Sequence, residues 1–340
     1  MLSNNQPFGL INLGNTCYMN TILQTLFICC DFNEEVLMAQ NKLKKGTMVN
    51  SYKTILRRMI DRSKRGSKGK LKLTNFIQTF RNNFQHVSFN QQDAHEAMFF
   101  LLSKLHENLK EEFTSQIFID TIRDMRYNKK IKNECARQIR KMYNKDYSMI
   151  NEYFYGQWCS VVKCSKCNHE VNRVEVFKGF NLEIKNTNNL NEAIKEYMTP
   201  ENLEDYKCDN CQERNNCSKK YVLLNTPKYL FVQLKRFNFD WNTNRFSKEN
   251  KKVEFPDYLH FKDYLLQNNE NKNVENIDLY KLKSIINHEG AVQGGHYYSY
   301  HNFKNNWVKC DDEDVSFIDE DKTHTTYAYI LLYEKVKVNN

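Results

Sequence analysis

Two pairs of closely spaced cysteines constrain the fold of this chain more than any other feature. Cys164 and Cys167 form one Cys-x-x-Cys pair, Cys208 and Cys211 form the other, and 40 residues separate the two pairs. Each pair can present two thiolates from one tight turn, and two such turns complete the four-sulfur tetrahedron in which zinc is held. We therefore expect one structural zinc ion, which requires two distant segments of the chain to meet.

Other uses of the cysteines stay open at this point. The chain has 11 cysteines, and the two pairs can also be interpreted as redox or packing pairs. Cys217 and His169 lie near the pairs in sequence and are possible substitute ligands. Cys135 and Cys159 are expected to be packing residues.

The start of the chain and its hydropathy favour an intracellular protein. Residues 1–6 have neither the basic start nor the apolar stretch of a secretory signal, and no apolar run reaches the ~18 residues of a membrane helix. We expect a cytoplasmic or nuclear protein that contacts no membrane and whose cysteines are thiols or metal ligands. Hydrophobic residues make up 40% and aromatic residues 13% of the chain, which is enough for a sizeable core.

The net charge raises the question of nucleic-acid binding. Basic residues outnumber acidic residues by 50 to 41, which gives a formal charge of +9. The densest basic runs are residues 62–72 and 123–145. Neither run is accompanied by an aromatic ladder or by zinc-finger spacing, so we interpret both as solvated surface and expect no nucleic-acid partner.

The hydrophobic periodicity changes along the chain. Apolar residues recur at helical spacing in residues 19–27 and 94–109, and Ser88 or Asn90 could cap the second helix. Residues 229–237, 296–301, 307–310 and 327–333 alternate or run as strands, with a turn at Asn305-Asn306. A helical half followed by a strand-rich half predicts an α+β fold, with a cleft where the halves meet.

Cys17 is the strongest candidate for a nucleophile. It opens an amphipathic helix after Gly14, which loosens the backbone, and after Asn15 and Thr16, which can cap a helix. A helix N-terminus favours negative charge and therefore favours the reactive thiolate. Asn12 carries a side-chain amide that can donate to an oxyanion. The alternative is a buried cysteine that packs as a small hydrophobe.

A thiolate nucleophile needs a base, and the base needs an orienting group. His296 opens a predicted strand beside Gly294 and Gly295, which permit close approach of the backbone. The next predicted strand ends at Asp311. If the two strands are antiparallel neighbours, the start of one lies beside the end of the other, which can place the Asp311 carboxylate on the imidazole. An early cysteine with a late histidine and aspartate is the order of papain-like peptidases.

These motifs resemble those of the ubiquitin-specific proteases, a papain-like family of deubiquitinases. Residues 9–26 match the family's cysteine box, and residues 290–312 resemble its histidine box. Residues 91–96 resemble its Gln-Gln-Asp-Ala-x-Glu element, and residues 227–237 resemble its strand that contains Leu-Lys-Arg-Phe. The matches run in order along nearly the whole chain, so chance similarity is excluded.

The resemblance implies a role for each catalytic residue. Cys17 is expected to be the nucleophile, and His296 the general base and later the acid. Asp311 is expected to orient His296, and Asn12 to help stabilise the oxyanion. Asp312 is a second acid whose share in the role of Asp311 stays open. The activity implied is hydrolysis of the isopeptide or peptide bond after the Gly-Gly end of ubiquitin, through an acyl-enzyme.

The resemblance also implies a fold shaped like a right hand. We expect one catalytic domain over residues 1–340, with a helical thumb in about 1–150, fingers in about 151–225 and a β-sheet palm mainly in 226–340. The zinc of the four cysteines would be structural and would lie at the tip of the fingers. His288 matches a loop position of the family and not the base.

The substrate implied is ubiquitin and ubiquitinated proteins. Gly295 and Tyr297 are expected to shape a narrow channel for the Gly-Gly tail, and Asp93 and Glu96 to pair with the arginines that precede it. Asp93 and Glu96 can also be interpreted as negative charges that stabilise the N-terminus of a helix through its dipole. A catalytically inactive ubiquitin-binding module, a protease for another modifier with a Gly-Gly tail, and an unidentified regulatory partner stay open.

Overall fold

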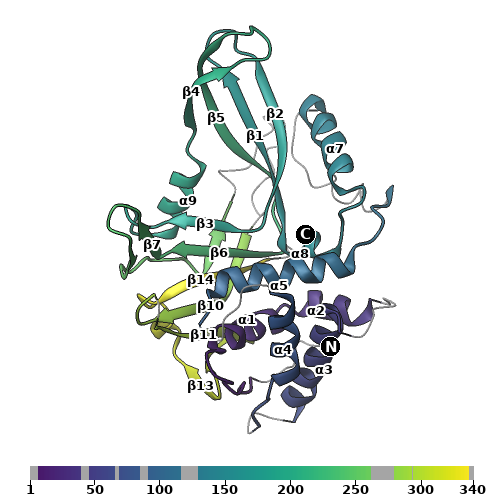
Figure 1. Ribbon diagram of the computed structural model, residues 1–340, viewed down its shortest axis with the longest axis vertical. Helices are drawn as coiled ribbons and strands as arrows, with labels where there is room; N and C mark the ends of the chain where they lie inside the picture. Colours follow the sequence, from purple (N-terminus) through teal and green to yellow (C-terminus); the bar gives the residue numbers. More distant parts are fainter. Residues whose placement is uncertain are drawn as a thin grey trace.

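The molecule joins a helical N-terminal region to two large β-sheets and a separate two-stranded sheet (Figure 1). The computed structural model describes residues 7–39, 46–65, 69–84, 91–115, 129–261, 279–292 and 294–336, with only the backbone of 129–132. Its helices are α1 (Cys17–Phe27), α2 (Cys30–Met38), α3 (Met48–Lys64), α4 (Thr74–Asn83), α5 (Ala94–Leu109), α7 (Lys129–Tyr143), α8 (Met149–Phe154), α9 (Leu190–Met198) and the short 3₁₀ helix Glu320–Lys322. None of these helices is long and apolar enough to span a membrane.

Most strands follow the helices in sequence. They are β1 (Gly156–Cys164), β2 (Glu170–Phe177), β3 (Phe180–Glu183), β4 (Glu201–Lys207), β5 (Arg214–Asn225), β6 (Tyr229–Lys235), β7 (Phe237–Asp240), β8 (Arg245–Lys248), β9 (Tyr258–His260), β10 (Leu279–Glu289), β11 (His296–Phe303), β12 (Asn306–Asp311), β13 (Asp314–Ile318) and β14 (Ala328–Lys335). Strands β6, β11, β12 and β14 confirm the four strands predicted from the sequence.

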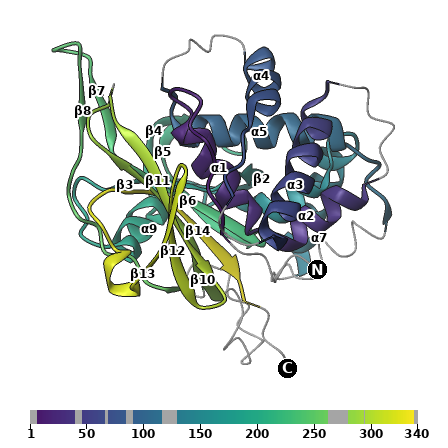
Figure 2. The ribbon, with the colours of Figure 1, turned by 90° about the horizontal axis from the view of Figure 1, so that it is seen from below.

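Helix α1 lies where the helical region meets the larger sheet (Figure 2). All of its residues are buried, because it contacts α5 on one side and strands β10, β11 and β12 on another. A helix covered on several sides is buried all round, so the polar residues between the apolar positions of α1, among them Asn20 and Thr25, are buried as well. The helices and one face of the sheet therefore share a single hydrophobic core.

A buried polar network ties α1 to this sheet. The Thr25 hydroxyl of α1 lies 3.1 Å from the Ser284 hydroxyl of β10. His301 of β11 bonds Ser284 Oγ through Nδ1 at 3.0 Å and Ser299 Oγ through Nε2 at 2.8 Å. Burial lowers the pKa of His301 to about 3, so the ring is neutral at physiological pH. Both ring nitrogens are satisfied, as a buried imidazole requires.

The larger sheet has the strand order β13-β12-β11-β10-β14-β6-β3, and β9 pairs with β10. Strands β11 and β12 form a tight antiparallel hairpin in which Phe303 pairs with Asn306. Lys304 and Asn305 have φ values of 50° and 67°, as a two-residue type I′ turn requires. The turn thus begins one residue before the predicted Asn305-Asn306. The antiparallel pairing expected from the sequence is confirmed.

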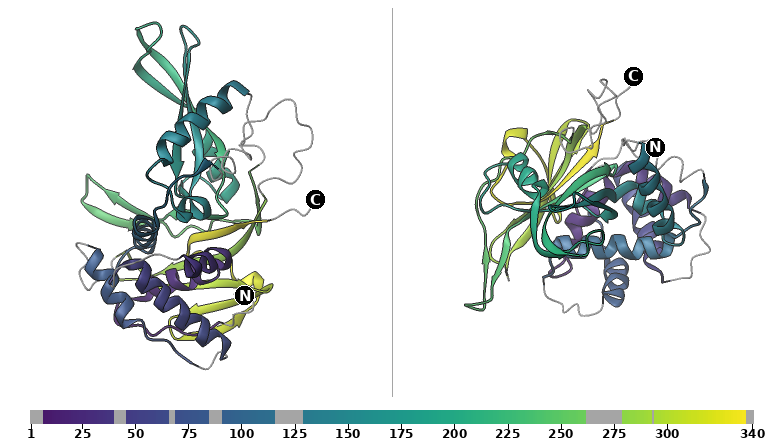
Figure 3. Two further views of the ribbon diagram at one scale, coloured as in Figure 1. Left: turned by 90° about the vertical axis from the view of Figure 1, so that its right-hand side faces the viewer. Right: turned by 90° about the horizontal axis from the view of Figure 1, so that it is seen from above.

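The smaller sheet, in the order β2-β1-β5-β4, projects away from the larger one (Figure 1, top). Helix α7 lies along it (Figure 3). Apolar residues of α7, among them Ile139 and Tyr143, pack on Val161 of β1 and on β5. Cys135 and Cys159 are both buried in this core, in agreement with their predicted packing role.

Helix α5 confirms the predicted helix over residues 94–109 but has a different cap. Ser88 and Asn90, the caps expected from the sequence, lie outside the described residues. Asp93 caps the helix: its Oδ1 accepts hydrogen bonds from the backbone N–H groups of His95 at 2.8 Å and Glu96 at 3.0 Å. An aspartate immediately before the first helical residue is a preferred cap, because its carboxylate satisfies N–H groups that have no partner within the helix.

Candidate active site

Cys17 is the first residue of α1 and is 1% exposed. A sharp turn sets its position, with φ values of 88° at Gly14 and 52° at Asn15. The predicted capping contact takes another form. The Thr16 hydroxyl turns back to accept the Leu13 N–H at 2.9 Å instead of capping α1. The turn and the helix N-terminus are thus braced by the loop that precedes them.

His296 and Asp311 meet at one end of the β11–β12 hairpin, as predicted. His296 Nε2 lies 2.6 Å from Asp311 Oδ1, and Lys309 Nζ lies 2.8 Å from the other carboxylate oxygen. The Cys17 thiol also interacts with the His296 ring. Because Asp311 accepts the proton of Nε2, the ring nitrogen left for the thiol is Nδ1. The imidazole therefore connects the carboxylate to the thiol.

The charges of His296 and Asp311 stabilise one another. The hydrogen bond to Asp311 and then the interaction with Cys17 raise the pKa of His296 to about 10. The His296 hydrogen bond, with help from Lys309, lowers the pKa of Asp311 to about 2. Both shifts favour an imidazolium paired with the Asp311 carboxylate. The His296 side chain is 43% exposed, so a substrate has access to the ring.

Asp312 holds a different set of side chains. Its Oδ2 accepts a hydrogen bond from Asn12 Nδ2 and its Oδ1 one from Asn20 Nδ2, both at 2.7 Å. The Asn12 amide oxygen in turn accepts the N–H groups of Gly14 at 3.0 Å and Thr16 at 3.3 Å. The Asn12 amide is thus fixed at both ends, and one hydrogen of its NH₂ group remains for another acceptor.

The segment before α1 is bound to the turn that carries Asp312. The Leu10 N–H donates to the Asp312 carbonyl at 2.8 Å, and a Cβ at Gly9 would overlap the backbone of Glu313. Burial raises the pKa of Asp312, against the hydrogen bonds from the two asparagines. Sequence reasoning missed Asn20. The available signal was an asparagine one turn after Cys17, within the cysteine box.

The four residues expected to contact a substrate occupy different environments. Asp93 directs Oδ1 to the helix cap and Oδ2 to the Tyr329 hydroxyl at 2.5 Å. Glu96, one turn into α5, is exposed. Tyr297 is 2% exposed; its hydroxyl accepts the Ala94 N–H at 3.4 Å, and its ring packs on that of His288.

Gly295 lies against a buried histidine. A Cβ at this position would overlap the ring of His288 and the backbone of Glu289, so no larger residue fits. The Gly295 carbonyl accepts a hydrogen bond from the Gln91 side chain, which joins it to the segment before α5. Burial lowers the pKa of His288 to about 4. His288 was expected in a loop; in the structure it is a buried residue near the end of strand β10.

The four predicted zinc ligands come together at the far end of the smaller sheet. Cys164 Sγ lies 4.0 Å from Cys211 Sγ, Cys167 Sγ lies 3.6 Å from Cys208 Sγ, and all four sulfurs lie within 4.8 Å of one another. Sulfurs bonded to one tetrahedral zinc at ~2.3 Å lie about 3.8 Å apart. The four thiols therefore fit a single zinc ion.

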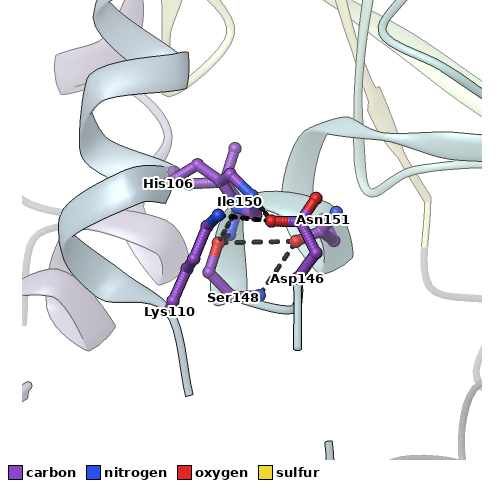
Figure 4. Close-up of polar contacts among 6 residues, drawn as sticks. All are labelled: His106, Lys110, Asp146, Ser148, Ile150 and Asn151. Atoms are coloured by element: carbon purple, nitrogen blue, oxygen red, sulfur yellow. Dashed lines mark hydrogen bonds and ion pairs between the residues drawn. The ribbon is translucent and has the colours of Figure 1, made fainter. Parts of the chain in front are cut away.

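A second histidine–carboxylate cluster joins α5 to α8 (Figure 4). His106 bonds the Ser148 hydroxyl through Nδ1 at 2.7 Å and Asp146 through Nε2 at 3.3 Å, and Lys110 also pairs with Asp146. Ser148 is fully buried and caps α8 by accepting the Ile150 N–H at 3.2 Å. A hydroxyl in this position has a structural role, since no substrate reaches it.

The comparisons with known proteins decide between the families that use such a site. A family model described as ubiquitin carboxyl-terminal hydrolase matches residues 8–333. The chain belongs to the ubiquitin carboxyl-terminal hydrolase family. Ubiquitin carboxyl-terminal hydrolase 4 of Arabidopsis thaliana is 28% identical over 97% of this chain and 93% of that protein. Ubiquitin carboxyl-terminal hydrolase 3 of Homo sapiens is 29% identical over 96% of this chain and 67% of that protein.

Solved structures place the hydrolase in the same fold. A yeast SAGA DUB module with a mutant Sgf73 contains a chain that matches with a TM-score of 0.73 and 25% identity, over 100% of this chain and 70% of that chain. The SAGA Ubp8/Sgf11/Sus1/Sgf73 DUB module bound to ubiquitin aldehyde matches with a TM-score of 0.74 and 24% identity, over 100% and 71%. The predicted α+β fold with a papain-like thumb, fingers and palm is confirmed. The protein is a ubiquitin-specific cysteine protease.

Proposed function

We propose that this hydrolase cleaves the isopeptide or peptide bond after the C-terminal Gly-Gly of ubiquitin, with Cys17, His296 and Asp311 as its catalytic triad. The observation that carries the proposal is the His296 ring, which is hydrogen-bonded to the Asp311 carboxylate on one side and interacts with the Cys17 thiol on the other. A nucleophile, a base in contact with it and a third group that orients the base are what covalent catalysis by cysteine requires.

The reaction uses each of these groups in turn. The Cys17 thiol gives its proton to His296 Nδ1, and the sulfur attacks the carbonyl carbon of the terminal glycine. The oxyanion that forms accepts a hydrogen bond from the free N–H of Asn12, and the N-terminus of α1 favours the negative charge. His296 protonates the leaving lysine amine, which breaks the C–N bond and leaves an acyl-enzyme. His296 then takes a proton from water, and the hydroxide attacks the acyl carbon. The C–S bond breaks, which releases ubiquitin as the carboxylic acid, and His296 returns the proton to the Cys17 sulfur.

A Gly-Gly tail suits the entrance to this site. Cys17 is 1% exposed, and Gly295 has no room for a side chain beside His288. A substrate backbone without side chains is therefore the kind that can reach the sulfur. We propose Gly295 and Tyr297 as residues that shape this entrance. Their hydrogen bonds to the start of α5 support that role.

The arginines before the tail would meet acidic groups at the start of α5. We propose Glu96, which is exposed, as a direct partner of an arginine. Both carboxylate oxygens of Asp93 already accept hydrogen bonds within the enzyme, from the start of α5 and from Tyr329. We propose that the same carboxylate also attracts an arginine of the substrate. We also propose that the four cysteines bind a structural zinc ion and that residues 1–340 form one catalytic domain. A cytoplasmic or nuclear location is part of the same proposal.

The decisive experiment for this function is covalent trapping. Ubiquitin that carries an electrophile in place of its C-terminal carboxylate should label the purified chain once, at Cys17, as seen by peptide mass spectrometry. Other modifiers with a Gly-Gly tail serve as parallel probes. Labelling by one of these in preference to ubiquitin would favour the alternative substrate, and labelling at a different cysteine would contradict the assignment of the nucleophile.

The partners follow from the same proposal. The similar SAGA DUB module contains Ubp8, Sgf11, Sus1 and Sgf73 and is bound to ubiquitin aldehyde. We propose ubiquitin and ubiquitinated proteins as the partners of this hydrolase. A regulatory partner remains a prediction.

Asp312 and Asn12 are expected to act as one unit in catalysis. Replacing Asn12 with alanine removes an oxyanion donor, and we expect kcat to fall about 10²- to 10³-fold with a small change in KM. Asp312→Ala frees the Asn12 amide to rotate and should lower kcat in the same sense. Because both changes disable one donor, the double variant should lose little more than Asn12→Ala alone.

Steady-state kinetics of the three variants test this coupling. Asp314→Ala is the matched control, because it removes an exposed carboxylate two residues away. Its kcat should stay close to that of the unaltered enzyme. Effects of Asn12→Ala and Asp312→Ala that multiply in the double variant would show that the two residues act independently.

Zinc analysis should find about one ion per chain, bound by the four cysteines. Cys208→Ser is expected to abolish stable zinc binding and to lower the melting temperature, since four ligands close the site and its binding energy is folding energy. Atomic absorption and thermal melts check both effects, with Cys30→Ser on α2 as the control. A metal-free enzyme of unchanged melting temperature would refute the zinc site.

A further inference from the structure

A fifth cysteine lies beside the four-cysteine cluster. Cys217 of β5 is 2% exposed and belongs to the same small core as Cys164 and Cys208. It faces Cys164 directly in the antiparallel pairing of β1 with β5. The next pair of residues carries the hydrogen bond from the Ser165 N–H to the Asn216 carbonyl, at 3.3 Å. Cys164 and Cys217 therefore form a non-hydrogen-bonded pair, in which facing side chains lie closest.

Asn215 shows where the Cys217 sulfur points. Its Oδ1 lies 3.2 Å from Cys164 Sγ and 3.6 Å from Cys217 Sγ, and its Nδ2 lies 3.9 Å from Cys211 Sγ. Two sulfurs thus contact one amide oxygen at the edge of the cluster. Residues 215 and 217 lie two apart on β5, so both side chains project from the same face of the strand. The Cys217 sulfur accordingly faces the metal site from the side of Cys164.

We propose that Cys217 is a reserve zinc ligand that can take the place of Cys164. The inference rests on the four-cysteine zinc site proposed above. Zinc with four thiolates has no open position, so Cys217 can bind only as another sulfur leaves. In the exchange, the bond from zinc to Cys164 breaks, the bond to Cys217 forms, and the proton of the Cys217 thiol passes to the departing Cys164 thiolate.

The strand pairing makes Cys164 the ligand that is replaced. Its side chain and that of Cys217 leave paired strands on one face, so rotation of two side chains moves one sulfur out and the other in. Cys167 and Cys208 contribute their sulfurs from the two turns and stay in place in both ligand sets. The other explanation for a buried cysteine is that it only packs in the core. In that case zinc binding would not depend on Cys217.

Four variants of the full-length chain test the proposal. Cys164→Ser should retain about one zinc per chain, whereas the double variant Cys164→Ser/Cys217→Ser should lose it. Cys208→Ser, at a ligand that does not face Cys217 in the strand pairing, should also lose zinc. Cys217→Ser alone should keep it. The zinc content of the unaltered chain tests the four-cysteine site separately, so failure of that site and failure of the reserve ligand are distinguishable.

The absorption spectrum of the cobalt-loaded protein counts the sulfurs that are bound. Cobalt-loaded Cys164→Ser should show the charge-transfer intensity of four thiolates, and the double variant that of three or fewer. Loss of zinc from Cys164→Ser to the same extent as from Cys208→Ser, or a three-thiolate spectrum, would overturn the proposal.

A second measurement applies if Cys164→Ser does not fold. Cys217→Ser leaves all four primary ligands intact, so its folding is not at issue. Without a sulfur to hold the metal when Cys164 detaches, this variant should release zinc to a chelator about tenfold faster than the unaltered chain. Equal release rates would then overturn the proposal.

Discussion

Cys17→Ala is expected to abolish hydrolysis of a ubiquitin C-terminal amide and to leave ubiquitin binding close to that of the unaltered enzyme. The sulfur is the group that bonds to the substrate carbonyl, and loss of a nucleophile from a catalytic triad costs roughly 10⁴- to 10⁶-fold in kcat. Removing one sulfur from a position that is 1% exposed costs about 1 kcal/mol of stability, which leaves the fold intact. Turnover and binding should therefore separate.

Fluorogenic turnover and calorimetric binding of ubiquitin measure the two effects. Cys30→Ala is the matched control, because it removes a half-buried thiol from the neighbouring helix α2 and should leave kcat unchanged. A Cys17→Ala enzyme that still hydrolyses the amide would show that the nucleophile is misassigned. Loss of ubiquitin binding together with turnover would mean that the sulfur also supports the fold of the binding surface.

Two substitutions of Asp311 should separate its orienting effect from its charge. Asp311→Ala removes both, and we expect kcat to fall about 10²-fold or more, because His296 is no longer held with Nδ1 toward the thiol. Asp311→Asn keeps an amide oxygen that can still accept the Nε2 proton, so its loss of kcat should be smaller. The comparison shows how much of the role is geometric.

The pH dependence of kcat/KM should show the effect of the Asp311 charge on His296. The Asp311 hydrogen bond is the largest cause of the raised His296 pKa of about 10, so the imidazolium should lose its proton at lower pH in both variants. The alkaline limb of kcat/KM should accordingly move to lower pH. Asp314→Asn alters the exposed partner of Asp311 across the β12–β13 turn and should move neither kcat nor the limb. An unmoved limb in both Asp311 variants would exclude control of the His296 charge by this carboxylate.

Much of the site could be predicted because its residues lie in segments with strong local signals. Cys17 follows a turn and opens an apolar helix, and His296 and Asp311 bound two strands joined by a short turn. Because the two strands pair as a hairpin, His296 Nε2 and Asp311 Oδ1 lie 2.6 Å apart although the residues are 15 apart in sequence. The predicted strands already implied this proximity. The cysteine spacing likewise predicted the cluster at the end of the smaller sheet.

The details that could not be predicted depend on contacts between distant segments. Asp93 was expected to pair with a substrate or to suit the N-terminus of its helix, and it does cap α5, but its bond to Tyr329, 236 residues later, could not be predicted. Asp312 was a second candidate to orient the base, and in the structure it holds Asn12 and Asn20. The local sequence does not show which of the adjacent residues Asp311 and Asp312 binds the base, because the direction of each side chain depends on the backbone conformation. Asp312 has a φ of 49°, and although its carboxylate lies within 4.8 Å of the His296 ring, its hydrogen bonds go to the two asparagines.

The buried chain of Thr25, Ser284 and His301 has a consequence for how activity is lost. The nucleophile belongs to a helix and the base to a sheet, and this hydroxyl–imidazole relay is one of the contacts that set their spacing. A slight slip of helix against sheet separates sulfur from ring while every element remains formed. On heating, turnover should therefore cease before the secondary structure melts, so that inactivation precedes denaturation.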